Sequence, residues 1–319
     1  MNFIQYNNNK LIINLLKLPL ELVDIIEKYT YFKPKNKQEL QNALYLMYIN
    51  KEEALKKYGI ISEWNTSLIN DMSYLFQNNT HFNENIEQWD VSNVTNMSHM
   101  FNNCTHFNQP LNNWNTSKLM NIDRMFFCCR NFNQPLNNWN TSNITNMNCA
   151  FYGCRNFNQE LENWNTSNVN NMNYMFKGCV VFNQPLNNWN TSNVKTMAYM
   201  FYGCLEFNQP LNQWNTINVK NMNSMFYECE KFNQDLNSWN MSNVTQIQSM
   251  FGYCFNFNKP LNSWDVSNVK NMNYMFFCCT NFNQPLNNWN VSNVQTMDTM
   301  FRYCENFQQP IHEWNFGIY

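Results

Sequence analysis

One stretch of this chain, read from Phe132 to Met147, is Phe-Asn-Gln-Pro-Leu-Asn-Asn-Trp-Asn-Thr-Ser-Asn-Ile-Thr-Asn-Met. It returns with few changes, at one fixed spacing, from about residue 61 to the C-terminus. All 11 tryptophans of the 319-residue chain lie 25 residues apart, from Trp64 to Trp314. A fixed period of about 20 to 50 residues is typical of a solenoid, in which each unit buries its apolar face against its neighbours. The sequence therefore predicts a solenoid of about ten 25-residue repeats over residues 61–319.

The second half of each repeat has the apolar spacing of a helix. From Ile144 onward, apolar residues recur at the i, i+3, i+7 and i+10 positions. Ser142 precedes this run and suits a helix N-cap, and Gly153 follows it at a place suited to a left-handed residue. We therefore expect two to three turns of helix over about residues 143–152.

The first half of each repeat favours an extended conformation. Residues 134–140 contain Pro135 and several Asn, which weaken a helix interior. A short strand around residues 136–139 is the better interpretation, and stacked coils would align these strands in a sheet. The expected fold class is an α/β, leucine-rich-repeat-like solenoid with one short strand and one short helix in each coil.

Residues 1–60 have a different pattern and predict a small helical leader. Pro19 opens a first helix, because the missing N–H costs nothing in the first turn. Asn36 and Asn50 are each followed three residues later by Glu, which is the capping-box pattern for a second and a third helix. Gly59 suits the end of the third. We interpret these helices as an N-terminal cap over the otherwise open end of the core.

Composition excludes some classes of function. Twenty basic and 22 acidic residues give a net charge of −2, which argues against a nucleic-acid-binding surface. No run of about 18 apolar residues predicts a membrane helix, and no small-residue cleavage site follows the apolar run at residues 11–18. The expectation is an intracellular protein without membrane insertion.

The repeat also resembles a known family. The pattern Phe-Asn-Gln-Pro-Leu-x-x-Trp-x-Thr-Ser-x-Val-x-x-Met-x-x-Met-Phe-x-x-Cys is similar to BspA-like repeats, including the 25-residue mycoplasma-type surface-protein repeat of unknown function. The resemblance covers residues 61–319. It implies a leucine-rich-repeat-like solenoid and, in bacterial members, adhesion at the cell surface. A cell-surface adhesin is therefore one alternative function.

The leader offers a second alternative. The segment Leu18-Pro19-Leu20-Glu21-Leu22, with the two isoleucines that follow, resembles the opening of an F-box, a module that docks substrate receptors onto cullin-type ubiquitin ligases. The simpler interpretation is a capping helix that begins with Leu-Pro. The ligase interpretation would assign docking of a ligase adaptor to Leu18, Pro19, Leu22, Ile25 and Ile26.

The residues that could carry chemistry are better explained as core. Nine cysteines repeat every 25 residues from Cys104 to Cys304, and three more, Cys128, Cys149 and Cys278, lie off this ladder. Cysteine packs well as a small apolar side chain, and no pair has zinc-site spacing. The four histidines do not recur, and with 6 glycines no phosphate-binding loop is apparent. We expect no enzyme, no cofactor and no metal.

The remaining candidate surface is the pair of polar residues before each Trp. Asn and Gln offer donors and acceptors without charge, so a row of them suits a protein or glycan partner; hydrogen bonding along the row is the simpler interpretation. The prediction is a non-catalytic scaffold that binds a macromolecular partner, most simply a protein, through a polar strand face. The candidate residues are Asn112, Asn113, Asn137, Asn138, Asn163, Asn187, Asn188, Asn212, Gln213, Asn287 and Asn288.

Overall fold

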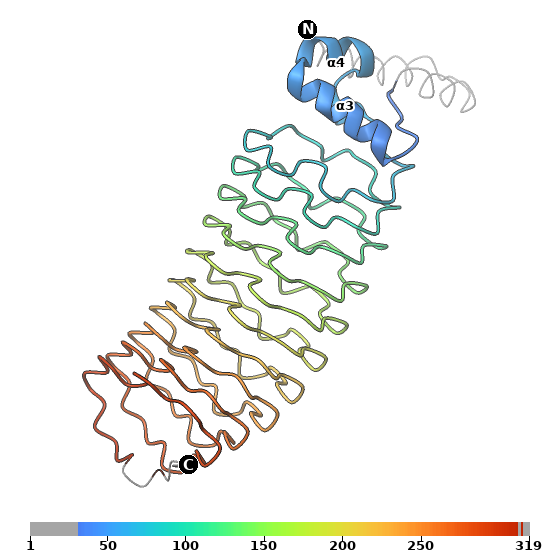
Figure 1. The fold of residues 1–319 in the computed structure, drawn as a ribbon. Helices are drawn as coiled ribbons and strands as arrows, with labels where there is room; N and C mark the ends of the chain where they lie inside the picture. Colours follow the sequence, from blue (N-terminus) through green and yellow to red (C-terminus); the bar gives the residue numbers. More distant parts are fainter. Residues whose placement is uncertain (1–30, 312–313, 315–319) are drawn as a thin grey trace.

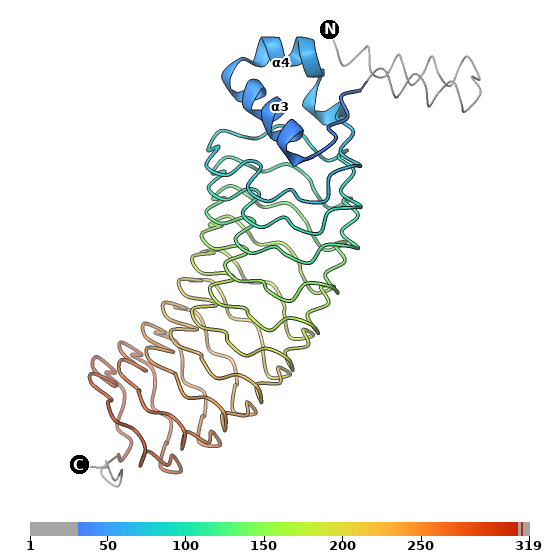
Figure 2. The same ribbon diagram turned by 45° about the vertical axis from the view of Figure 1, so that its right-hand side comes forward.

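The computed structural model describes residues 31–311 and 314 of the chain. The repeats form similar coils that stack along one gently curved axis, with two helices across the first coil and the C-terminal residues at the opposite end (Figures 1 and 2). Consecutive coils are related by 25 residues, as the spacing of the tryptophans predicts.

Two helices precede the coils. Helix α3 spans Lys37–Ile49, helix α4 spans Lys51–Tyr58, and a short 3-10 helix, η1, spans Ile61–Glu63. The side chain of Asn36 accepts a hydrogen bond from the N–H of Glu39, and that of Asn50 accepts one from the N–H of Glu53. The predicted second and third helices are therefore confirmed with their caps, and the expected helix that opens at Pro19 lies outside the described residues.

Helix α3 closes the end of the core. Leu40 and Ala43 are fully buried against the first coil, and Phe32 packs its ring 5.1 Å from that of Trp64. The Nζ atom of Lys37 donates to Asp71 Oδ2 at 3.1 Å and to Ser73 Oγ at 2.6 Å. The helix thus covers apolar side chains and also binds polar groups of the first coil that have no preceding coil to meet.

The prediction of a helix in every coil is wrong. In the coil that contains residues 143–152, alternate N–H groups leave the coil: those of Met147, Cys149 and Phe151 donate to the carbonyls of residues 171, 173 and 175 in the next coil. The N–H groups of Ala150 and Tyr152 donate to carbonyls three residues back, as in successive turns, and that of Asn148 donates to the side-chain oxygen of Asn146. A turn that winds every three to four residues also points side chains inward at near-helical spacing, which explains the misleading pattern.

The predicted strand is wrong as well. Residues 136–139 form a turn, in which the N–H of Trp139 donates to the carbonyl of Leu136 at 3.1 Å. Regular pairing is limited to single-residue parallel bridges, which run from Asp71 through Asn146 to Thr296, one in each coil. The described part of the chain therefore has neither a sheet nor a helix within its coils, and the α/β, leucine-rich-repeat-like class does not apply.

Left-handed residues make the successive turns. Each coil holds two residues with positive φ, four positions apart, such as Cys149 at 53° and Gly153 at 71°. A positive φ at the third residue of a turn is what a type II turn requires. The left-handed conformation expected at Gly153 is thus correct, but it serves a turn and not a helix end. Equivalent places hold Gly178 and Gly203, whereas the next coil has Glu228 there.

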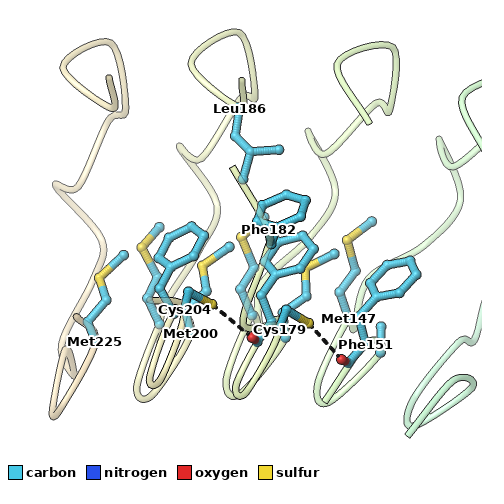
Figure 3. Packing of buried hydrophobic residues seen from close by; sticks show 14 of the residues in the cluster. Met147, Phe151, Cys179, Phe182, Leu186, Met200, Cys204 and Met225 are labelled. Carbon is cyan, nitrogen blue, oxygen red and sulfur yellow. Dashed lines mark hydrogen bonds between the residues drawn. The ribbon is translucent and has the colours of Figure 1, made fainter. Parts of the chain in front are cut away.

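Between these turns lies a core of identical side chains stacked coil upon coil. Phe126 and Phe151 stack with ring centroids 5.5 Å apart, and Trp139 and Trp164 at 6.4 Å. Each of the tryptophans from Trp89 to Trp289 also donates its indole N–H to a carbonyl 28 residues earlier, as Trp164 does to Leu136 at 2.9 Å. Figure 3 shows the Met, Phe and Cys side chains of neighbouring coils in such rows.

Exchanging residues at the left-handed positions tests this account of the turns. We expect Glu228→Gly to raise the free energy of unfolding by about 1 kcal/mol, because glycine adopts positive φ without a Cβ clash. Gly178→Ala should lower it by about 1 kcal/mol, since the added Cβ meets nothing closer than 3.7 Å and the cost is the backbone conformation alone. Urea unfolding followed by tryptophan fluorescence measures both. Equal stability of the two variants would contradict the left-handed assignment.

The cap contact of Lys37 predicts a pH-dependent effect. Burial raises the pKa of Asp71, but hydrogen bonds from Ser73 and Lys37, with the lysine charge, outweigh burial and hold this pKa below its usual value. Lys37→Met should therefore lower the free energy of unfolding by about 1 kcal/mol at pH 7.

Because the folded-state pKa is lowered, the stabilisation is present above the unfolded pKa of about 3.9 and is lost as pH falls through the folded-state value. The difference between Lys37→Met and the native chain should shrink at pH 3, measured by urea unfolding. Lys51→Met is the matched control, because its partner Glu84 lies in an exposed pair and its loss should change little. A loss of stability that is the same at both pH values would rule out the ion pair as its cause.

Candidate binding surfaces

The predicted Asn rows lie at the surface, in the turn before each Trp. All 11 candidate residues are half-buried or exposed, and the structure brings them together as two rows along the stack. They do not lie on a strand face, because the described coils have no strand there.

Much of this row is engaged within the protein. The side-chain oxygens of Asn112, Asn137 and Asn187 accept hydrogen bonds from backbone N–H groups 26 residues later, at 3.0 to 3.1 Å. The amides of Asn113 and Asn188 bind the carboxylates of Glu87 and Glu162. These contacts support the simpler interpretation of the rows, since amides that hold neighbouring coils together have less capacity for a partner.

A second surface differs from coil to coil. It consists of the three rows that follow each Trp by 10, 13 and 14 residues, which we call the variable face. The first of these rows reads Tyr74, His99, Arg124, Cys149, Tyr174, Tyr199, Ser224, Ser249, Tyr274 and Thr299. By contrast, the position just before each Trp is Asn, Gln or Ser in every coil from residue 88 to residue 288. The first and third of these rows adopt the left-handed conformation of the turns, but their side chains vary from coil to coil and can therefore serve recognition.

Aromatic residues run along the variable face from residue 127 to residue 303, interrupted only at Lys177. Their ring centroids are 4.4 to 5.5 Å apart from Phe127 to Tyr152, from Tyr202 through Tyr227 and Tyr253 to Phe277, and on to Tyr303. Lys177 fills the one gap, between Tyr152 and Tyr202. We call this set the aromatic strip: Phe127, Tyr152, Lys177, Tyr202, Tyr227, Tyr253, Phe277 and Tyr303.

Lys177 is the charged centre of the aromatic strip. Its Nζ lies 4.3 Å from the ring centroid of Tyr202 and within 5.4 to 5.7 Å of those of Tyr152, Tyr174 and Tyr199. Such cation–π contacts stabilise a partly desolvated ammonium. Burial lowers the pKa of Lys177, although the charge of Glu228 opposes this. Burial also raises the pKa of Tyr202 and Tyr227, so these tyrosines keep their hydroxyl protons at neutral pH.

Sequence reasoning missed the aromatic strip. Its residue types differ from coil to coil, so the period of the repeat does not single them out. The usable signal was the variation itself, since tyrosine returns several times among otherwise unrelated residues at the same three positions of the repeat.

One cluster on the variable face brings titratable groups together. Asp123 lies 3.1 Å from Arg124 Nη1 and 3.6 Å from His99 Nε2, with Cys149 beside Arg124. Burial lowers the pKa of His99, so its ring is neutral at pH 7, and burial raises the pKa of Cys149 to about 11. A protonated, buried thiol is a poor nucleophile. The cluster therefore has the features of a surface ion-pair network.

The cysteine ladder holds neighbouring coils together. Each Sγ from Cys104 to Cys304 lies 2.8 to 3.0 Å from the carbonyl oxygen of the Phe 28 residues earlier, as Figure 3 shows for Cys179 and Cys204. Burial raises the pKa of these thiols, that of Cys104 to about 12. The thiol is thus the donor that this contact needs. The described residues include no group of three His, Cys, Asp or Glu side chains placed to hold a metal ion.

Two further expectations have separate outcomes. The candidate ligase-docking residues Leu18, Pro19, Leu22, Ile25 and Ile26 lie outside the described residues. Within the described residues, none of the helices has the length and apolar character needed to cross a bilayer.

Comparison with known proteins gives one match. Residues 43–161, 145–255 and 230–318 match the family described as "Mycoplasma protein of unknown function, DUF285". These stretches overlap and cover most of the chain. Neither the curated proteins nor the solved structures give a significant match.

The burial of the ladder predicts the reactivity of the thiols. At pH 8 we expect a thiol reagent such as DTNB to modify Cys128 and Cys278, which are half-buried, before the other ten of the 12 cysteines. The ladder thiols should react only as the protein unfolds. The variant with Cys128→Ser and Cys278→Ser is the control and should have no fast-reacting thiol. Rapid reaction of more than two thiols in the native protein would contradict the burial of the other ten.

Proposed function

The chain belongs to this mycoplasma repeat family of unknown function, and we propose that it is a non-catalytic scaffold that binds a protein partner. The binding surface in this proposal is the variable face. The Asn rows predicted from the sequence are the competing surface.

The aromatic strip is the observation that supports this proposal. Tyrosine is enriched at protein interfaces, because it contributes a large contact area together with a hydroxyl for hydrogen bonding. Tyr274 and Tyr303, on or beside the strip, are 41% and 55% exposed, so part of this aromatic area remains available. The tyrosines are also held by their neighbours, so little side-chain entropy is lost on binding.

The charges beside the aromatic strip favour a partner of mixed charge. Arg124 lies on the variable face near the N-terminal part of the strip. Arg130 and Arg155 follow the strip residues Phe127 and Tyr152 by three positions. Glu228 and Glu230 lie near its centre. A charge pattern of this kind sets the orientation and specificity of a partner more than its affinity.

Two finer points belong to the same proposal. The similarity of the repeat to BspA-like repeats, whose bacterial members adhere to other cells, supports binding as the class of function. The ladder thiols act as hydrogen-bond donors and need the reduced form, which fits action inside the cell. A ligase-receptor role for the leader remains a prediction.

The proposal also holds that the protein is not an enzyme. This part rests on the chemistry of the side chains present. The cysteine ladder is buried and protonated, and the ion-pair cluster around Asp123 holds a neutral histidine without an activated nucleophile.

Affinity capture with matched variants tests the proposal. The full-length protein is compared with Tyr202→Ala plus Tyr227→Ala, on the aromatic strip, and with Asn188→Ala plus Gln213→Ala, on the Asn rows. We expect the native chain and the Asn-row variant to capture the same protein from lysate of cells that express the chain. The strip variant should capture it at least about tenfold less, as loss of central aromatic contacts does elsewhere.

The variants also separate the competing outcomes. Loss of capture by the Asn-row variant alone would move the binding surface to the Asn rows. Equal capture by all three proteins, or capture of nothing, would overturn the proposal. Thermal unfolding of each variant checks that the coils remain folded.

A further inference from the structure

The first coil has an unpaired backbone edge. In the second coil, the carbonyls of Met100 and Asn102 accept hydrogen bonds from the N–H groups of Phe76 and Asn78 in the first, at 2.9 and 2.8 Å. The equivalents in the first coil, 25 residues earlier, are the carbonyls of Leu75 and Gln77. No donor within residues 31–311 reaches these two carbonyls. Backbone carbonyls that no described residue reaches can accept hydrogen bonds from the N–H groups of a ligand.

Helix α3 leaves a groove beside this edge. Leu40 and Ala43 of the helix are fully buried, whereas Leu44 and Met47 in its second half are only partly buried against the core and line the groove. The groove has a volume of about 610 Å³, in the range of ligand pockets. Leu44, Met47, Tyr45 and Tyr48 form its helix wall. Leu75, Gln77, Phe76 and Phe82 are among the residues of its coil wall.

The wall of the groove also departs from the repeat at one position. Every later coil from residue 104 to residue 304 has Cys there, which donates to a carbonyl of the preceding coil. The first coil has no preceding coil, and it has Asn79, which lines the groove. An amide side chain can both donate to and accept from a peptide backbone, which a thiol does poorly.

We propose that this groove binds an extended, apolar peptide segment of a partner protein. The segment runs parallel to residues 75–78 and donates two backbone N–H groups, to the carbonyls of Leu75 and Gln77. An aromatic or aliphatic side chain of the peptide lies between Phe76 and Met47. This is strand addition, in which the main chain gives affinity and the apolar pocket gives specificity.

Helix α3 covers most of the first coil, so the partner can add only a single segment. Helix α3 lies across the coil (Figure 1), so a second copy cannot stack a whole coil there. What stays open is the edge of one backbone segment, which continues the contact already made between every pair of coils. The groove includes Gln77 and Asn78 from the first coil of the variable face but shares no residue with the aromatic strip, so its test does not depend on the proposed function.

A peptide copied from an inner coil is the probe. Residues 197–205 include Phe201 and Gly203, whose N–H groups donate to residues 225 and 227 of the next coil at 2.9 and 2.8 Å. The synthetic peptide carries Cys204→Ser and a fluorescent label, and fluorescence anisotropy measures its binding to the full-length protein. We expect saturable binding.

Ester substitutions in the peptide test the two hydrogen bonds. Replacing the N–H of both Phe201 and Gly203 by an ester oxygen should weaken binding by about tenfold or more, because two donors are lost. The same change at Ala198, whose N–H does not face this edge in the proposed arrangement, should alter binding by less than about twofold. Equal binding of all the peptides, or no saturable binding of the parent peptide, would overturn the proposal.

Protein variants locate the site. Tyr45 and Tyr48 are 64% and 70% exposed, so Tyr45→Ala plus Tyr48→Ala should keep the fold and weaken peptide binding. Tyr274→Ala, an exposed residue of the variable face, is the matched control and should leave it unchanged. Binding that appears only after residues 1–30 are removed would assign the groove to the chain's own leader and refute the partner. Loss of binding in the control alone would place the peptide on the variable face and also refute the groove.

Discussion

The whole structure depends on the amide groups that each coil leaves for the next. In the inner coils, alternate N–H groups such as those of Met147 and Phe151 point out of their own coil and find carbonyls 24 residues later. A buried amide without a partner costs about 1–3 kcal/mol, so a coil of a different length would leave several unpaired groups at once. The indole, thiol and amide side chains repeat the same requirement at spacings of 24 to 28 residues. This explains why the repeat has one length from the first coil to the last.

The sequence predicted the period, the buried residues and the leader helices α3 and α4, because these depend on spacing and capping that are local and periodic. The predicted backbone conformation of the coil, a strand followed by a helix, was wrong. Ile144, Met147 and Phe151 point inward at helical spacing, yet a succession of left-handed turns gives the same inward spacing. Non-glycine residues such as Cys149 adopt the left-handed conformation there, and only contact between coils makes that conformation favourable. The Asn rows were located at the surface correctly, but the aromatic strip was missed because its residues do not repeat.

Core and surface therefore divide the repeat into two kinds of position. The Phe, Trp, Cys and most Asn positions are fixed by contacts between coils, which accounts for a chain that is rich in asparagine and poor in charge. The side chains that follow each Trp by 10, 13 and 14 positions vary from coil to coil, although the backbone at positions 10 and 14 makes the left-handed turns. Tyrosines gather there around Lys177, so the part of the molecule whose side chains vary most is also the part with the chemistry of an interface.

The fixed length of the coil has a consequence for how such a chain changes over generations. Inner coils make the contacts described above only with the coil before and the coil after, and these contacts are nearly the same throughout. A genetic deletion or duplication of one whole 25-residue unit would rejoin coils that already fit, whereas a change of a single residue in length would not. Recombination between the similar gene segments would thus shorten or lengthen the molecule in whole steps, and each step would remove or add one rung of the variable face. The protein can acquire a new surface without redesigning its core.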